Sequence, residues 1–354
     1  MADVHSAEKS TNVRSNLSRL AAFGVARAFT WAPSVSASAA LYLWAHPQRR
    51  TRPAREASIL DGATPIRIPM GMGSLAGWRW TPRSAAASSA SLGAQAPRAL
   101  AVHTATSAAG APTVLLVHGW EGRGSQLGSF VEPLVDAGYS VVSFDAPAHG
   151  DSQGERASLI RFADAIDAAV RSVGPVHGIV AHSMGGAATL LAISGGLDVK
   201  RLVLVAPADP SHAIARFSDA VGIPDTVQAR MEDDLVTRYG AGIRTFGAPV
   251  LAAGSPAPAL VIHDHADRWV PIADGHAYAD ARPDFVLVET NGLGHHRILR
   301  DPSVIASTVR YLGGADAVPV EIDAPERRAA LPTGPLDAIT ITEEEILSDL
   351  AHGR

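Results

Sequence analysis

The chain has 354 residues, a formal net charge of −5 and a hydrophobic content of 47%, which is enough for one large domain or two small ones around a sizeable core. The mildly acidic charge and the lack of a long Lys/Arg-rich run argue against nucleic acid as the main partner. The absence of cysteine excludes disulfides, cysteine-ligated zinc and a cysteine nucleophile, and it suits a cytoplasmic protein.

Residues 1–60 are expected to form an N-terminal helical extension. Their apolar run, Leu20 to Trp44, is interrupted by Arg27 and Pro33, whereas a membrane-spanning helix needs about 20 uninterrupted apolar residues. A secretory signal with Ala37-Ser38-Ala39 as its cleavage site is the weaker alternative, because the run is broken and its lead-in is long. We expect helices packed against the body and no stable membrane span.

Two short strands, Thr64–Met70 and Leu75–Trp80, are predicted next, joined by a turn that contains Gly71 and Gly73. Residues 84–112 are rich in Ala and Ser and lack periodicity. Such a stretch can bury little surface, so we expect a surface loop.

From residue 113 onward, short apolar runs alternate with helical stretches. The predicted strands are Thr113–His118, Ser140–Asp145, Val176–His182, Arg201–Ala206, Ala259–His263 and Phe285–Glu289. The predicted helices include Ala157–Ser172, Gly185–Ile193 and Pro302–Leu312. This alternation indicates an α/β fold, a mostly parallel central sheet with helices on both faces. Active sites of such sheets lie at the carboxyl ends of the strands.

The main domain is expected over residues 61–318. Within it, residues 209–254 break the alternation and are predicted to form a small helical cap. Residues 319–354 are expected to be a loosely held tail.

A candidate nucleophile, Ser183, directly follows the strand predicted over Val176–His182. The surrounding order resembles the strand–nucleophile–helix turn written G-x-S-x-G, with Ala181 replacing the first glycine and Gly185 as the second. A serine that merely caps a helix is the competing interpretation. The position between an apolar strand and a helical stretch favours the nucleophile.

Two candidate carboxylates, Asp264 and Asp267, follow the strand Ala259–His263. A carboxylate is needed to hold an imidazole in the correct tautomer and to stabilise its charged form. We favour Asp267, because Val270-Pro271 follows it closely, as expected where the loop turns into a helix. An exposed turn aspartate is the alternative.

Two candidate bases, His295 and His296, follow the strand Phe285–Glu289 in a Gly-rich loop. A general base must reach the serine hydroxyl, and glycine lets the loop present a histidine without steric conflict. We favour His295, because it directly follows Gly294. Ser, Asp and His then occur in chain order, each after a predicted strand.

Acyl transfer also needs two backbone N–H groups that face the developing oxyanion. Met184, the residue after the candidate nucleophile, would supply one. Trp120, after His118-Gly119 at the end of an early strand, would supply the other. Nearby Arg123 could meet an anionic substrate group or form a surface ion pair.

Together these segments resemble the α/β-hydrolase superfamily over about residues 113–312. The nearest likeness is to bacterial serine hydrolases similar to monoacylglycerol lipases and lysophospholipases, in which an Asp-x-x-x-His-Gly-x-Ser segment recurs, here from Asp145 to Ser152. The resemblance implies an α/β-hydrolase fold and a lipase-like serine esterase activity without cofactor. It also implies that Asp145 and His149 shape the floor of a loop rather than do chemistry.

We therefore predict a serine hydrolase that cleaves a carboxylic ester of a small molecule through an acyl-enzyme, with no cofactor and no metal. One alternative is a catalytically inactive binding protein on the same fold. A less favoured one is a metal-dependent hydrolase that uses the run His263-Asp264-His265-Ala266-Asp267. The sequence does not predict the oligomeric state.

Overall fold

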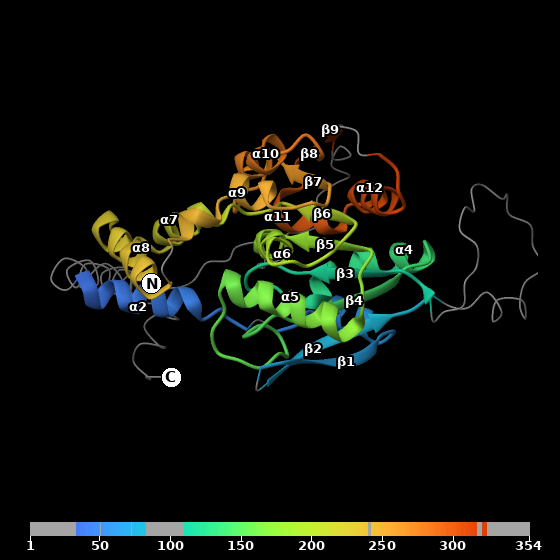
Figure 1. The fold of residues 1–354 in the computed structure, drawn as a ribbon, viewed down its shortest axis with the longest axis horizontal. Helices are drawn as coiled ribbons and strands as arrows, with labels where there is room; N and C mark the ends of the chain where they lie inside the picture. The colour runs from blue at the N-terminus through green and yellow to red at the C-terminus, as the bar shows by residue number, and fades with distance from the viewer. Residues whose placement is uncertain are drawn as a thin grey trace, which may run out of the picture.

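The computed structural model describes residues 33–49, 51–71, 73–82, 110–239, 242–316 and 321–323. In this part of the chain, nine strands form one sheet in the order β1-β2-β4-β3-β5-β6-β7-β8-β9, with helices on both faces (Figure 1). β1 and β2 form an antiparallel hairpin at one edge, β2 pairs antiparallel with β4, and the other neighbours are parallel. The predicted α/β-hydrolase architecture is confirmed.

The strands match the sequence prediction closely. Their bounds are β1 Thr64–Met70, β2 Gly73–Trp80, β3 Thr113–Val117, β4 Ser140–Phe144, β5 Gly178–His182, β6 Arg201–Val205, β7 Ala259–Asp264, β8 Phe285–Asn291 and β9 Glu321–Asp323. Only β9 has no predicted counterpart. It extends the sheet into the segment that we expected to be a tail.

From β3 to β8, each strand is followed by one or more helices before the next strand begins. The α-helices are α2 Pro33–Ala45, α3 Ala54–Leu60, α4 Val131–Asp136, α5 Leu159–Val173, α6 Met184–Ser194, α7 Ala213–Val221, α8 Asp225–Tyr239, α9 Ala248–Ala253, α10 Ile272–Asp280, α11 Gly294–Arg297 and α12 Pro302–Leu312. Short 3₁₀ turns are η3 Gly124–Phe130, η4 Pro210–His212, η5 Ile243–Phe246 and η6 Ile298–Arg300. Helix α5 begins two residues later than predicted, because the Ser158 side chain caps it by accepting a hydrogen bond from the Arg161 N–H.

The sheet divides the main core into two layers. Alternate residues of a strand point to opposite faces, so Leu115 and Val117 of β3 pack in the layer that contains α5, α6 and α9. Val114 and Leu116 pack in the layer that contains α4 and α12. Both faces of the parallel strands are therefore buried, which explains their continuous apolar sequences.

A separate apolar cluster joins the N-terminal helix α2 to helices α7 and α8 of the predicted cap. Its buried members are Ala37, Ala40, Leu41, Ile214, Ile223, Val227, Met231 and Leu235. These three helices lie together at one end of the body (Figure 1). By contrast α9, at the end of the same predicted cap, packs into the main core through Ala248, Leu251 and Ala252.

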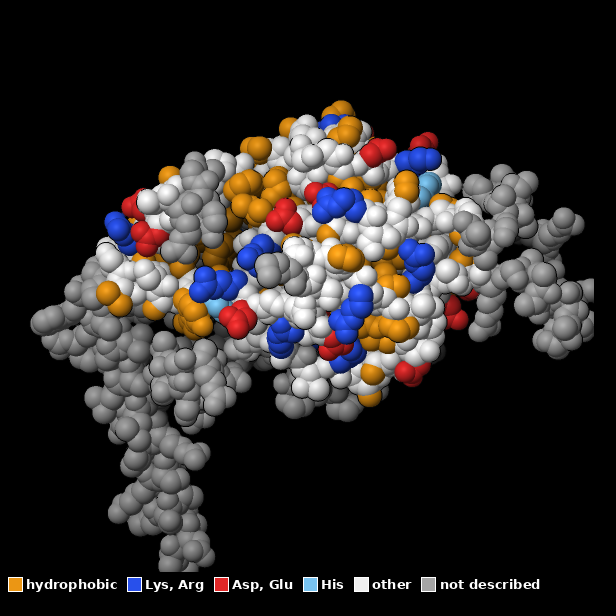
Figure 2. Space-filling view, turned by 60° about the horizontal axis from the view of Figure 1, so that its bottom comes forward, with side chains coloured by type: hydrophobic (Ala, Val, Ile, Leu, Met, Phe, Trp, Pro, Cys, Tyr) orange, Lys and Arg blue, Asp and Glu red, His pale blue; other side chains and the backbone are white. Residues whose placement is uncertain are grey.

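Several sequence expectations concern residues outside the described ranges. They include residues 1–32 of the N-terminal extension and most of the 84–112 segment. Among the described helices, none combines the length and apolar character needed to cross a membrane. On the described part of the face in Figure 2, basic and acidic side chains are interspersed rather than gathered by sign.

Candidate active site

Ser183 lies on a strained turn between β5 and α6. Its backbone has φ 54° and ψ −127°, a region that non-glycine residues rarely adopt and that is found at functional sites. The turn is tight because α6 passes close to β3: a Cβ on Gly185 would lie 2.4 Å from the His118 carbonyl oxygen. The side chain of Ser183 makes no capping hydrogen bond to α6, so the helix-cap interpretation is wrong.

Asp267 and His295 are hydrogen bonded to each other. The distance from His295 Nδ1 to Asp267 Oδ2 is 2.7 Å, and both side chains are almost fully buried. A carboxylate accepts only, so Nδ1 carries the proton. The imidazole is therefore in the tautomer whose Nε2 can accept a proton.

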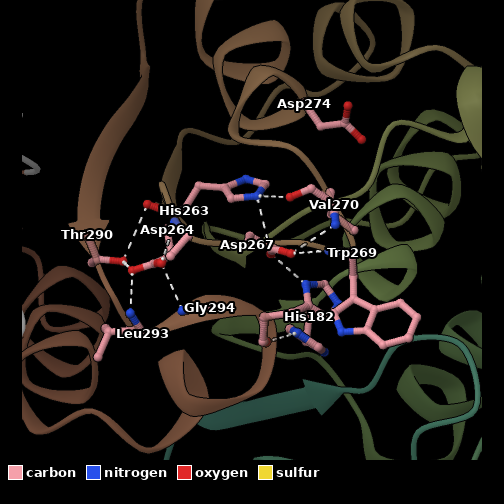
Figure 3. A network of polar contacts seen from close by, with 12 residues as sticks. His182, His263, Asp264, Asp267, Trp269, Val270, Asp274, Thr290, Leu293 and Gly294 are labelled. Atoms are coloured by element: carbon pink, nitrogen blue, oxygen red, sulfur yellow. Dashed lines mark hydrogen bonds and ion pairs between the residues drawn. The ribbon is translucent and has the colours of Figure 1, made fainter. Parts of the chain in front are cut away.

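The neighbouring candidates, Asp264 and His296, are not the partners in this pair. Asp264 turns away to bind the loop that follows β8: its carboxylate accepts hydrogen bonds from the backbone N–H of Leu293 at 2.9 Å and of Gly294 at 2.8 Å, and from the Thr290 hydroxyl at 2.7 Å (Figure 3). Asp264 thus fixes the loop that carries His295.

The Asp267 carboxylate is surrounded by donors. Its Oδ1 accepts from the backbone N–H of Trp269 and Val270, both at 2.9 Å, and His263 Nε2 lies 3.5 Å from its Oδ2 (Figure 3). Burial raises the pKa of Asp267, but hydrogen bonds from His263 and His295 outweigh it and hold the pKa well below its usual range. The carboxylate is therefore ionised when it faces His295.

His182 connects the Ser183 turn to the Asp267–His295 pair. Its Nε2 lies 3.0 Å from the backbone oxygen of His295, and the two rings are 4.5 Å apart. Burial, and then the neighbouring histidines, keep the pKa of His182 well below the usual range of a histidine. His182 is therefore neutral and donates from Nε2. Because it directly precedes Ser183, this bond places the backbone of His295 beside the serine turn.

The loop after β3 also packs against Ser183. Gly119 approaches so closely that a Cβ there would lie 2.8 Å from Ser183 Cβ. Trp120 is the next residue, and Met184 follows Ser183 at the first position of α6. The two residues predicted as oxyanion donors therefore both adjoin the Ser183 turn.

Two buried histidines support this loop. His118 Nε2 accepts from the Ala146 N–H at 2.9 Å, and His149 Nε2 accepts from the Glu121 N–H at 3.0 Å. Burial is the main cause that lowers the pKa of His118 to about 3 and that of His149 to about 4. Both are neutral hydrogen-bonding parts of the scaffold.

Asp145 also holds this region together. Its carboxylate accepts from the backbone N–H groups of Gly124 and Asp151, each at 2.7 Å. Burial is the largest influence and raises its pKa. The bonds tie the loop after β4 to the loop after β3.

The run from His263 to Asp267 does not converge on one point. His263 is fully buried and directs Nε2 to the Val270 carbonyl at 3.0 Å, whereas His265 is exposed and bonds Glu289 at 2.6 Å. No group of three or more His, Asp or Glu residues in the described ranges is arranged to hold a metal ion.

Sequence reasoning missed a buried ion pair behind the loop. Arg123 binds Glu56 of α3 through Nε and Nη2, at 2.6 and 2.7 Å. Its side chain is 12% exposed, so the expected ion pair exists but is mostly buried rather than on the surface, and the expected substrate contact stays a prediction. No local signal marks a partner 67 residues earlier in the chain.

Comparison with known proteins assigns the chain to a family. The model of the alpha/beta hydrolase family matches residues 114–329, more than half of the chain. The chain belongs to the alpha/beta hydrolase family. No curated protein matches the sequence. The nearer likeness to monoacylglycerol lipases and lysophospholipases stays a prediction.

Solved structures of other alpha/beta hydrolase-like proteins share the fold. An esterase from Pyrococcus furiosus is 16% identical, with a TM-score of 0.53, and the match covers 76% of this chain and 98% of that one. A bromoperoxidase from Bacillus anthracis is also 16% identical, with a TM-score of 0.50, 71% of this chain covered and 100% of that one. At this identity the likeness speaks for the fold alone.

Proposed function

We propose that this alpha/beta hydrolase is a serine esterase with Ser183 as nucleophile, His295 as general base and Asp267 as the carboxylate that orients the base. The observation that carries the proposal is the juxtaposition at three strand ends: a serine in a strained strand–helix turn beside a buried, hydrogen-bonded Asp–His pair. A binding protein gains nothing from a strained serine next to such a pair, so strain at this position favours catalysis.

In the proposed reaction, His295 Nε2 takes the proton of the Ser183 hydroxyl as its oxygen attacks the ester carbonyl. Asp267, held ionised by its donors, stabilises the imidazolium that forms. The protonated His295 then donates this proton to the leaving alcohol, which leaves an acyl-Ser183 ester. Water activated by His295 hydrolyses that ester and restores the serine.

We propose that the backbone N–H groups of Trp120 and Met184 bind the oxyanion. Gly119 supports this assignment, because its lack of a side chain brings the loop after β3 against Ser183. Each donor directed at such an oxyanion contributes on the order of a hundredfold or more in rate.

For the acyl part of the substrate we propose a cavity of about 410 Å³ between α2, η5 and the start of α5. Its apolar lining includes Leu41, Trp44, Ile160 and Phe246, and the Trp44 ring stacks on Trp120 with centroids 6.4 Å apart. The size is in the range of small-molecule sites. Candidate catalytic residues line neither this cavity nor a larger hollow of about 620 Å³ beside the β1–β2 hairpin, so the Trp44–Trp120 contact is what favours the smaller cavity.

The test is hydrolysis of p-nitrophenyl esters from acetate to palmitate by the wild type and by Ser183→Ala. We expect turnover that depends on Ser183, with a chain-length optimum that Phe246→Ala shifts toward longer chains. Turnover that persists in Ser183→Ala would rule out the assigned nucleophile. A folded wild type that hydrolyses none of the series would rule out the esterase.

A further inference from the structure

The N-terminal arm, which we define as the described residues 44–49 and 51–60, runs alongside the loop that adjoins Ser183. Contacts occur at successive points: the Trp44 ring stacks on the Trp120 ring, and the Gln48 N–H donates to Glu121 Oε1 at 3.3 Å. The arm precedes the segment that matches the family model, which begins at residue 114. The loop is thus lined by residues outside the family match.

Further along the arm lies a mostly buried ion pair. Glu56 is 7% exposed and receives two hydrogen bonds from the Arg123 guanidinium, at 2.6 and 2.7 Å. The Ser125 hydroxyl donates to the same carboxylate at 2.8 Å. Paired N–H donors on one carboxylate fix orientation as well as distance, and a lysine cannot reproduce that fork.

A second cation of the arm, Arg52, extends the network to Asp145 and Asp151 in the loop after β4. Its guanidinium lies 3.3 Å from the buried Asp145 carboxylate and 2.9 Å from Asp151, and Nε donates to Ser125 at 3.2 Å. Both ends of the segment from Arg123 to Ser125 are therefore held by the charged side chains of Glu56 and Arg52.

The turn that precedes this segment, Gly119–Gly122, is itself strained. Gly122 N–H bonds the Gly119 oxygen at 3.1 Å, which closes a turn, and Glu121 occupies its third position with φ 52°. That position of such a turn favours glycine. A glutamate persists there only if surrounding contacts hold it, and here the His149 ring and Gln48 do so.

We propose that Glu56 and Arg123 are positioning residues for the oxyanion hole: the arm holds the 119–125 turn in the conformation that presents the Trp120 N–H to the oxyanion. The inference rests on the proposed esterase function. A displacement of about 1 Å at such a donor can cost on the order of a hundredfold in rate, so loss of the fork is expected to act mainly on the transition state.

The test compares Arg123→Lys and Glu56→Gln with the wild type in the full chain, well below the melting temperature of each variant. Three quantities are measured: kcat and KM for p-nitrophenyl butyrate, and the inhibition constant of an alkyl trifluoromethyl ketone. That ketone forms a tetrahedral adduct whose oxyanion uses the same donors.

We expect kcat and the affinity for the ketone to fall together by about tenfold or more, with KM changed less than twofold. The matched control is Arg282→Lys, which removes a bidentate pair with Asp284 at 2.7 and 2.6 Å on another part of the surface. It should leave all three quantities within twofold.

The inference would be overturned by folded variants that keep the kcat and the ketone affinity of the wild type, including variants whose only change is a lower melting temperature. If the ionic variants do not fold, Ser125→Ala, which removes one hydrogen bond to the Glu56 carboxylate, is read by the same criteria. Failure of the esterase proposal is recognised separately, because the wild type would then lack turnover that depends on Ser183.

Discussion

The two sides of the Ser183 turn are built in different ways. On the side that we propose for acid–base catalysis, Asp267 and His295 stand just after neighbouring parallel strands, β7 and β8, and bind each other directly. On the side that we propose for the oxyanion, the loop from Gly119 to Arg123 contacts an arm whose residues lie about seventy positions earlier in the chain.

The difference shows which parts of the site the fold itself supplies. Parallel strands bring their carboxyl ends together whatever precedes them, so the Asp–His pair follows from the sheet alone. The Gly119–Gly122 turn carries a non-glycine residue at φ 52°, and the contacts that hold it come from outside the sheet. We expect substitutions on the first side to remove a group that takes part in proton transfer. We expect substitutions on the second side to displace a backbone donor without removing it.

The largest effect is expected from Asp267→Asn. An amide can donate to His295 Nδ1 and thereby favour the wrong tautomer, which in a Ser–His–Asp site lowers kcat by roughly 10⁴-fold. Steady-state kinetics with p-nitrophenyl butyrate measure this, and melting temperature serves as the check on folding.

Asp264→Asn is the matched comparison for that variant. Asp264 binds the N–H groups of Leu293 and Gly294, so we expect a larger loss of melting temperature but a smaller loss of kcat than for Asp267→Asn. The reverse order would assign the catalytic carboxylate to Asp264.

Next in size is Gly119→Ala. The added methyl group would lie 2.8 Å from Ser183 Cβ and 3.2 Å from the His182 oxygen, so the loop after β3 must move away from the serine. We expect kcat to fall by about a hundredfold. Gly62→Ala, where nothing lies within 4 Å of the new Cβ, should stay within twofold; equal activities for the two variants would contradict the assigned oxyanion side.

A smaller effect is expected on stability in mild acid. His118 and His149 have pKa values lowered to about 3 and about 4 in the folded state, against about 6.5 when unfolded. The unfolded chain therefore binds protons first. Their stabilising contribution is complete above pH 6.5 and declines below it, by about 1.4 kcal/mol per pH unit for each histidine.

Urea unfolding at pH 8, 6 and 5 measures this decline. His149→Gln should reduce the slope of the unfolding free energy against pH by the contribution of one histidine, about 1.4 kcal/mol per pH unit. A free energy of unfolding that stays constant from pH 7 to pH 5 would show that these rings are not held neutral.

Most of the sheet was predictable from the sequence, because β-branched and aliphatic runs of about five residues report burial on both faces. The positions of Ser183, Asp267 and His295 after strands were predictable for the same reason, because each follows such a run. The choice between Asp264 and Asp267 rested on the Val270-Pro271 that follows. In the structure Asp264 binds the Leu293–Gly294 backbone, whereas Asp267 binds His295.

Contacts between distant segments were not predictable. The partner of Arg123 lies in α3, and neither residue belongs to a periodic pattern that reveals the other. The cap was expected to be one insertion, yet α2 shares its apolar cluster while α9 belongs to the main core. A single sequence records which residues are apolar, but not which distant apolar surfaces meet.

The central claim is that Ser183 is the nucleophile, and the most direct measurement is mass spectrometry of the protein after reaction with a fluorophosphonate. We predict one adduct per chain, on the peptide that contains Ser183, and none in Ser183→Ala. An adduct on another residue, or equal labelling of Ser183→Ala, would contradict the account.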